Sequence, residues 1–262
     1  MREYRVRRHA NLFTNTARFY DLDLAWFPHH DIEFYTQLAA ATGGPILEAA
    51  CGTGRVTIPL ARAGYEVYAF DLSRQMLSLL RAKLTRLPME TARRIHLHRD
   101  DMASFEVGRR FPLVIVPFRS FQALTEEQDI AGALTALRRH LTPGGTAVID
   151  LFAVEGEPDS SWLGEQVDWV RRMPDSGEVV TRTRRGVRID RRRQIIHSEV
   201  GFHVEQPDGT RETAWDRFAL RYYHPYQIQV RLAAAGFRIT GEFGYYDRRP
   251  LETGPELLFL FQ

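Results

Sequence analysis

Carboxylates and glycines stand at the ends of successive apolar runs in the first half of the chain. Glu48 lies in ILEAACGTGRV, just ahead of Gly52 and Gly54; Asp71 ends the run YEVYAFD, and Asp101 follows the run IHLH. Glycine loops of this kind wrap nucleotide ligands, and carboxylates can accept hydrogen bonds from ribose hydroxyls and amino groups. The spacing therefore predicts a nucleotide-like ligand, whose type the loop must decide.

The glycine loop lacks the residues that two common nucleotide ligands require. A triphosphate loop needs a lysine and then Ser or Thr after its second glycine, where this chain has Arg55 and Val56. A dinucleotide loop needs a third glycine where Thr57 stands. Glu48 would also repel a pyrophosphate at short range. A cationic ligand without phosphates, such as S-adenosylmethionine with its ammonium and sulfonium groups, suits the loop better.

Carboxylates further along the chain fit the same ligand. Asp71 lies seventeen positions after Gly54, close to the spacing at which an acid meets a ribose diol. Taken alone, Asp71 could instead cap the helix expected near Ser73. In RDDM, a carboxylate could accept from the adenine amino group while Met102 packs on the ring. Of the neighbours Asp100 and Asp101, we favour Asp101 for this contact.

Short apolar runs alternate with helical segments from position 46 to about position 152. The runs have the usual strand length of about five residues, and this alternation predicts a parallel, doubly wound sheet with ligands outside its carboxyl ends. A capping box formed by Thr125 and Gln128 is expected to open the last helical segment. The strand-like runs are PILEAA, YEVYAFD, IHLH, PLVIVPF and GTAVIDLF, and the helical segments start near Arg55, Ser73 and Thr125.

The pattern changes after Asp150. Long strands are expected from Val167 to Tyr223, with a hairpin turn at Pro207-Asp208-Gly209. HPYQIQVRLAAAGF then predicts a helix, and RITGEFGYY and ELLFLFQ predict two strands that return to the main sheet. The fold class is thus α/β: a doubly wound, mostly parallel, seven-stranded Rossmann-like sheet with an inserted antiparallel β arm after the fifth strand. We expect a lid and cofactor core at 1–153, the arm at 154–223, and a helix and hairpin completing the sheet at 224–262.

Bulk composition narrows the class of protein. The 262 residues carry a formal net charge of +2, so no global field favours nucleic acid or an anionic membrane. The single cysteine, Cys51, excludes an internal disulfide and a multi-cysteine metal site. No run reaches the roughly 18 apolar residues of a membrane span, and the start does not read as a secretory signal. We expect a cytoplasmic protein with no metal and no membrane partner.

The stretch from about Tyr20 to Phe152 resembles a class I S-adenosylmethionine-dependent methyltransferase. The match rests on LEAACGTGR, AFDLSRQML, HRDDM, PLVIVPF and LTPGGTAVIDLF in the family's order, although Ala50 replaces the usual first glycine. The resemblance implies a cofactor, S-adenosyl-L-methionine, with S-adenosyl-L-homocysteine as product, and a segment ARFYDLDLAWF that closes over it. The implied cofactor residues are Tyr20, Glu48, Ala49, Gly52, Thr53, Gly54, Arg55, Asp71, Leu72, Met76, Asp100, Asp101, Met102, Pro117 and Phe118.

The layout is similar to small-molecule N-methyltransferases that act on amino sugars, glycine or natural products. VPFRSFQAL lacks the Pro-Pro-aromatic motif of amino-methylating DNA enzymes, and no proline-cysteine nucleophile is present. We expect the arm to cover the active site or to build a homo-oligomer. Candidates for the substrate pocket are Phe118, Arg119, Phe121, Trp162, His203, Tyr222, Tyr223 and Tyr245, and candidates for a catalytic role are Tyr20, Arg119 and His203.

Methyl transfer can proceed by orientation alone, which supplies effective molarities of about 10⁵ to 10⁸ M, so the acceptor is hard to identify from sequence. A neutral amine needs less help from a base than a hydroxyl does. We therefore expect N-methylation of a small amine or heterocycle, with small-molecule O-methylation as the alternative. An RNA methyltransferase using Arg182 to Arg193, and a protein that binds the cofactor without catalysis, are further alternatives. A solvated hairpin explains the arginines more simply, and we expect no nucleic-acid partner.

Overall fold

The computed structural model describes residues 13–25 and 30–262, and its main sheet has the predicted architecture. Seven strands follow the order β10-β11-β5-β4-β1-β2-β3; β1 to β5 are parallel to one another, and β11 is antiparallel to both β5 and β10. The strands are β1 (Ile46–Ala49), β2 (Val67–Asp71), β3 (Ile95–Arg99), β4 (Phe111–Val116), β5 (Leu141–Phe152), β10 (Ile239–Phe243) and β11 (Glu256–Phe261). The mostly parallel, seven-stranded sheet is confirmed.

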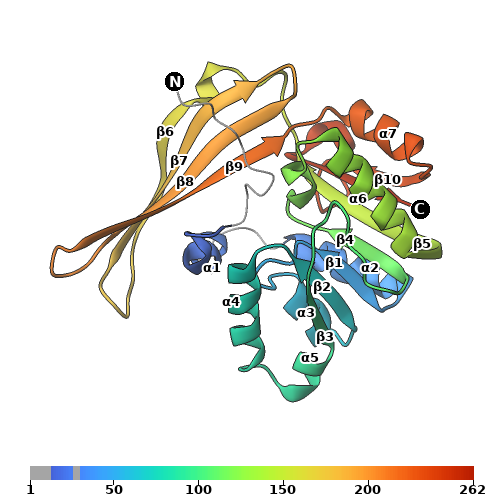
Figure 1. Cartoon of the computed structure of the whole chain (residues 1–262), viewed down its shortest axis with the longest axis horizontal. Helices are drawn as coiled ribbons and strands as arrows, with labels where there is room; N and C mark the ends of the chain where they lie inside the picture. Colours follow the sequence, from blue (N-terminus) through green and yellow to red (C-terminus); the bar gives the residue numbers. More distant parts are fainter. Residues whose placement is uncertain (1–12, 26–29) are drawn as a thin grey trace.

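Helices cover both faces of this sheet (Figure 1). Because successive side chains of a strand point to opposite faces, Ile46 packs with the first helical layer and Leu47 with the second. The first layer holds α2 (His30–Thr42), α3 (Thr57–Arg62) and α4 (Arg74–Leu84); the second holds α6 (Glu127–His140) and α7 (Pro225–Ala234), and the short α5 (Met89–Arg93) precedes β3. The sequence had not predicted α2.

The structure agrees with the helix start predicted near Ser73 and differs from the capping box predicted at Thr125. Ser73 is the N-cap of α4, where its hydroxyl accepts from the amide of Met76 at 3.3 Å. The capping box predicted for α6 is wrong, because the N-cap is Glu126 and no side chain caps it. The next residue, Glu127, is instead held by the guanidinium groups of Arg221 at 2.7 Å and Arg231 at 2.6 Å.

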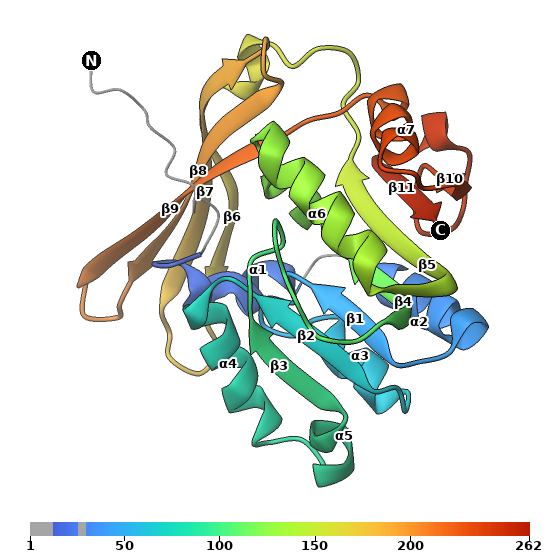
Figure 2. The same ribbon diagram turned by 45° about the vertical axis from the view of Figure 1, so that its right-hand side comes forward.

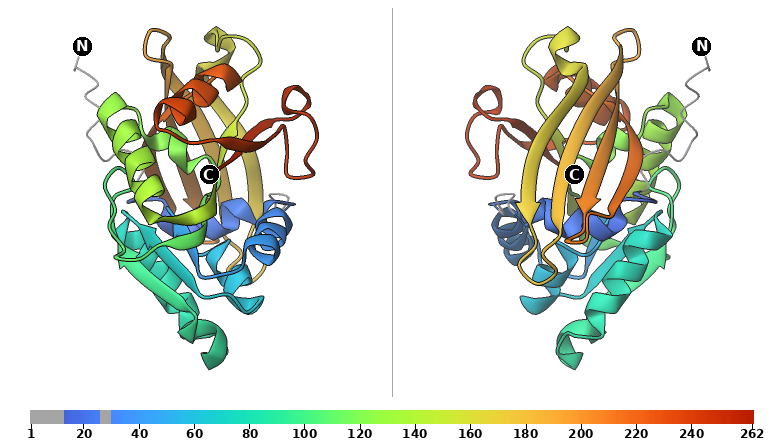
Figure 3. Two further views of the ribbon diagram at one scale, coloured as in Figure 1. Left: turned by 90° about the vertical axis from the view of Figure 1, so that its right-hand side faces the viewer. Right: turned by 90° about the vertical axis from the view of Figure 1, so that its left-hand side faces the viewer.

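The inserted segment forms a separate four-stranded antiparallel sheet of order β6-β7-β8-β9. It stands beside the α/β part, and its long strands can be followed in the right-hand view of Figure 3. Its strands are β6 (Gly164–Arg172), β7 (Val179–Asp190), β8 (Ile195–Glu205) and β9 (Arg211–Arg221). The predicted turn at Pro207–Gly209 joins β8 to β9, with Gly209 at φ +85°.

A short N-terminal segment lies between this arm and the α/β part (Figure 2). It comprises η1 (Ala17–Phe19) and α1 (Tyr20–Leu24). Trp26 and Phe27, which end the predicted closing segment, lie outside the described residues. Within the described ranges, no helix combines the length and the apolar character that crossing a membrane would require.

Candidate active site

A cavity of about 1020 Å³ lies where the carboxyl ends of the parallel strands face the arm. Its volume is at the upper end of the roughly 300–1,000 Å³ usual for ligand pockets. The cofactor residues predicted from sequence that line it are Tyr20, Gly52, Asp71, Leu72, Met76, Asp100, Asp101, Met102 and Phe118. The acids at the ends of β2 and β3 therefore meet at one edge of the sheet, as the topology required.

The glycine loop after β1 has left-handed backbone at three alternate positions. Ala50 has φ +55°, Gly52 has φ +55° and Gly54 has φ +86°. A Cβ on Gly54 would come within 2.4 Å of Cδ1 of Leu80, which is fully buried on α4. Gly54 is thus required by both conformation and space, whereas Ala50 adopts a backbone that glycine adopts more readily.

Asp71 organises the loop from the next strand. Its carboxylate accepts from the amide of Gly52 at 2.8 Å and from the amide of Ser73 at 2.8 Å. Burial raises the pKa of this carboxyl above its ordinary range, and these backbone donors oppose the rise. Asp71 therefore ties the glycine loop to the start of α4 and presents an acid to the cavity.

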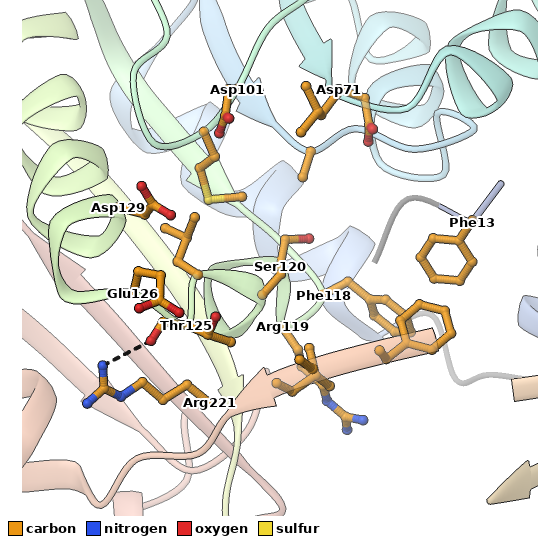
Figure 4. A pocket seen from close by; sticks show the side chains of 18 of the residues that line it. Phe13, Asp71, Asp101, Phe118, Arg119, Ser120, Thr125, Glu126, Asp129 and Arg221 are labelled. Atoms are coloured by element: carbon orange, nitrogen blue, oxygen red, sulfur yellow. Dashed lines mark hydrogen bonds between the residues drawn. The ribbon is translucent and has the colours of Figure 1, made fainter. Parts of the chain in front are cut away.

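Asp100 and Asp101 differ in what their carboxylates contact. Asp100 accepts from the amides of Asp101 at 2.8 Å and Glu106 at 3.0 Å, one on each oxygen. Asp101 accepts from the amide of Ala103 at 2.9 Å on Oδ1, and its side chain borders the cavity in Figure 4. This arrangement leaves Asp101 the better placed of the two to accept from a ligand.

Glu48 lies behind the loop and not on the cavity wall. It shares a strand face with Ile46, so it points toward the layer of α3, where it accepts from the hydroxyl of Thr57 at 2.6 Å. Its side chain is 1% exposed, and burial raises its pKa to about 8. The direct contact with a ligand ammonium that the sequence suggested has no support from this placement.

Other residues of the predicted cofactor set form the support of the cavity. The guanidinium of Arg55 donates to both oxygens of the buried Asp31 and lies 4.6 Å from the ring centroid of Phe118. Arg55 is therefore engaged by α2 and by the loop after β4. The predicted residues that do not line the cavity are Glu48, Ala49, Thr53, Gly54, Arg55 and Pro117.

The loop after β4 holds two consecutive non-glycine residues in left-handed backbone, Phe118 at φ +56° and Arg119 at φ +63°. Such strain persists only where the surroundings impose it. The amide of Arg119 donates to the fully buried Asp150, and its guanidinium pairs with Glu256. Asp150 also accepts from the hydroxyl of Tyr246 at 2.9 Å. This buried network fixes the Phe118 ring at the cavity.

The N-terminal segment covers the glycine loop. The Tyr20 ring lies 3.7 Å from the position that a Cβ on Gly52 would take, and the hydroxyl of Thr53 donates to Asp21 at 2.6 Å. Lys83 also donates to Asp21 at 2.7 Å. Burial raises the pKa of Tyr20 well above its ordinary value, which favours the protonated phenol.

Two of the predicted substrate residues, Phe118 and Arg119, line the cavity. Phe121 lies in the core, and Trp162 is 43% exposed. The other four predicted substrate residues do not line the cavity. His203 contacts Thr183 and Thr213 on the arm, and the hydroxyl of Tyr222 donates to Glu157. The buried hydroxyl of Tyr223 has no partner among the described residues, and Tyr245 contacts His30.

Sequence reasoning missed the residues that close the far end of the cavity. Most of them come from the start of α6 and from β9: Thr125, Glu126, Glu127, Gln128, Asp129, Phe218, Ala219, Leu220 and Arg221. Phe13 of the N-terminal segment and Arg192 and Arg193 of the turn between β7 and β8 also line the cavity. Figure 4 shows Glu126 and Asp129 on one side of the cavity and the rings of Phe13 and Phe118 on the other. The acid-rich TEEQD stretch was the available signal, but its direction depends on how α6 packs.

Comparison with known proteins finds methyltransferases similar to this chain. Residues 46–145 match a family described as a methyltransferase domain. The sequence is 29% identical to a dTDP-3-amino-3,4,6-trideoxy-alpha-D-glucopyranose N,N-dimethyltransferase of Streptomyces venezuelae, over 74% of this chain and 75% of that protein. Residues 46–145 are therefore a methyltransferase domain. Solved methyltransferases of this fold are complexes with S-adenosylmethionine.

Solved structures are similar to this methyltransferase over nearly its whole length. DesVI of Streptomyces venezuelae aligns with a TM-score of 0.73 at 26% identity, covering 94% of this chain and 97% of that one. The CcbJ methyltransferase of Streptomyces caelestis aligns with a TM-score of 0.76 at 22% identity, covering 97% and 98%. The second likeness is one of fold, and it includes the arm as well as the main sheet.

The cavity suits this cofactor chemically. Carboxylates line the wall at Asp71 and Asp101, which favours hydroxyl, amino and cationic groups and disfavours phosphate. Gly52 leaves the Tyr20 ring in contact with the loop. When bound, S-adenosylmethionine supplies a methyl carbon activated by positively charged sulfur, and the residues around it have to orient two reactants.

Proposed function

We propose that this methyltransferase transfers a methyl group from S-adenosylmethionine to a nitrogen of a small-molecule amine or heterocycle in natural-product metabolism. The observation that carries the proposal is one continuous cavity, which runs from the Asp71 carboxylate to the arm strand β9. A methyl donor and a small acceptor can share this space. The similarity to an amino-sugar N,N-dimethyltransferase supports the choice of nitrogen.

We propose a division of the cavity into two ends. At the cofactor end, Asp71 would accept from the ribose, Asp101 would accept from the adenine amino group, and Met102 would pack on the ring. Tyr20 would cover the methionine part above Gly52. Each of these side chains lines the cavity, and the first two present acceptors of the type that these groups require.

At the acceptor end, Asp129 and Glu126, whose carboxylate Arg193 contacts at 2.6 Å, would help to bind an amine, and Phe13, Phe118 and Phe218 would exclude water. S-adenosylmethionine would supply its methyl group to the lone pair of the neutral nitrogen and leave as S-adenosylhomocysteine, and the methylated ammonium would then have to lose a proton. A carboxylate can receive that proton. No histidine is among the described lining residues, which supports an amine over a hydroxyl that would need a stronger base.

A turnover assay with matched acceptors tests the choice of atom. The acceptors are a nucleotide-linked amino sugar and its analogue with a hydroxyl in place of the amine, with product mass as the readout. Methylation of the amine alone is expected. Methylation of the hydroxyl compound alone would establish the O-methyltransferase alternative. Absence of S-adenosylhomocysteine binding in calorimetry would remove the enzymatic proposal altogether.

Nucleic acid is not the proposed partner, because carboxylates already engage several of the arginines of β7. Arg182 donates to Asp23 at 2.9 Å, and Arg185 donates to Glu199 at 2.9 Å. Phosphate binding would have to displace these ion pairs. RNA affinity that falls steeply with salt, and that is lost when Arg191, Arg192 and Arg193 become alanine, would support the RNA alternative instead.

We propose that residues 1–153 and 224–262 form the catalytic core and that the arm, residues 154–223, completes the acceptor end. The same arm is our proposed surface for a homo-oligomer, because its edge strand β6 exposes Val167 by 61% and Val170 by 59%. The proposed location is cytoplasmic. Light scattering of the wild type and of Val170→Lys tests the oligomer, since a charge at the interface should yield monomers.

A further inference from the structure

A buried carboxylate of strand β9, Asp216, contacts the N-terminal strap, residues 13–24, through several hydrogen bonds. Asp216 is 9% exposed and accepts from the amide of Thr16 at 2.8 Å, from the hydroxyl of Thr16 at 2.6 Å and from the amide of Asn15 at 3.0 Å. The side-chain amide of Asn15 donates to it at 3.1 Å. A charged acceptor with this many donors makes strong hydrogen bonds.

The same strand face places Asp216 beside the cavity. Residues two apart on a strand point to one side, so Asp216 shares its face with Phe218. The ring of Phe218 lies 4.8 Å from that of Phe13, and Phe13 lies 4.9 Å from Tyr20 between centroids. Phe13, Tyr20 and Phe218 all line the cavity. The anchored start of the strap thus leads directly to the rings that enclose the site.

The other end of the strap is fixed to the glycine loop and to the far strands of the arm. Asp21 accepts from Thr53, as described above, and Asp23 accepts from the indole N–H of Trp169 at 3.0 Å. The strap therefore bridges the cofactor loop and the arm. Because Tyr20 lies between the two attachments, its place above Gly52 depends on both.

We propose that Asp216 is a positioning residue that latches the strap and thereby controls release of the cofactor. This inference rests on the proposed cofactor site. A residue of the acceptor-side arm would set how long S-adenosylmethionine or its product stays bound, since Tyr20 can leave Gly52 only when the contacts of Asp216 with Asn15 and Thr16 open. Cofactor exchange would then follow opening of the acceptor end.

The test measures S-adenosylhomocysteine binding kinetics, with no acceptor needed. Asp216→Asn keeps the shape but replaces a charged acceptor with an amide whose NH₂ faces N–H donors. We expect its dissociation rate to rise about tenfold, equivalent to about 1.4 kcal/mol, with the association rate little changed. Thr16→Val should give a smaller rise, and the double variant should be no worse than Asp216→Asn alone.

Glu212→Gln is the matched control, because Glu212 also lies on β9 and pairs with Arg18 of the strap. Both partners of that pair are more than half exposed, so the variant should leave the dissociation rate unchanged. A lower melting temperature for Asp216→Asn with an unchanged dissociation rate would overturn the latch. Failure of the wild type to bind S-adenosylhomocysteine would instead overturn the proposed function.

Discussion

Replacing Glu48 with glutamine should make the ligand-free protein more stable at alkaline pH. Glu48 is buried at the end of β1, and its pKa is raised to about 8 from an ordinary value of 4.5, chiefly by burial. A carboxyl that binds its proton more tightly in the folded state lowers the free energy of unfolding as pH rises. The contribution of Glu48 to the free energy of unfolding is fully present below about pH 4.5 and is lost progressively as the pH rises to about 8.

The size of the effect follows from the pKa difference. At about 1.36 kcal/mol per pKa unit, the rise from 4.5 to about 8 corresponds to roughly 5 kcal/mol as an upper bound. Glutamine cannot ionise, and its carbonyl can still accept from the hydroxyl of Thr57. Glu48→Gln should therefore be close to neutral at pH 5 and stabilising by several kcal/mol at pH 8.5.

Urea unfolding of the ligand-free protein at both pH values measures this difference. Glu256, whose pKa burial raises to about 7, contributes the same trend to wild type and variant and so cancels. Glu66→Gln, at an exposed position before β2, controls for the loss of one negative charge. A stability difference between Glu48→Gln and wild type that stays constant from pH 5 to 8.5 would refute the reasoning.

Three further predictions concern the loops around the cavity. Gly54→Ala should cost about 2–4 kcal/mol in urea unfolding through overpacking against Leu80 and left-handed backbone, and Leu80→Ala should recover part of the loss. Ala50→Gly should raise stability by about 0.5–1 kcal/mol because it relieves a left-handed alanine; a fall would show that the loop backbone is not strained. Asp101→Asn should weaken S-adenosylhomocysteine binding by tenfold or more in calorimetry, because a charged hydrogen bond is lost. Asp100→Asn should chiefly lower the melting temperature. Equal losses of binding in the two variants would contradict the different contacts of Asp100 and Asp101.

The main sheet was predictable because its signals are local. Strand length, apolar runs and the alternation with helices depend on neighbouring residues, and they gave the five parallel strands and the inserted arm. In a doubly wound sheet the carboxyl ends of the parallel strands lie at the same edge, so Asp71 and Asp101 could be placed together at that edge. The capping box at Thr125 failed because Arg221 and Arg231, far along the chain, hold Glu127.

The substrate end was beyond prediction because packing between distant segments makes it. Phe13, Glu126 and Phe218 come from the N-terminal strap, the start of α6 and the arm. No local pattern shows that these three residues face one cavity. Phe121 and His203 were equally plausible candidates in the sequence, yet Phe121 lies in the core and His203 contacts Thr183 on the arm.

By itself, the sequence predicted the methyl donor, because the glycines, the acids and their spacing act through a strand and turn that fold locally. Tertiary structure alone decided which acids line the cavity. Glu48 was the most informative residue in the sequence, yet strand parity turns it toward Thr57 and away from the cavity. The same docking of arm, strap and α6 decides which side chains meet the acceptor, since contacts between segments about 200 residues apart leave no periodic trace in the chain.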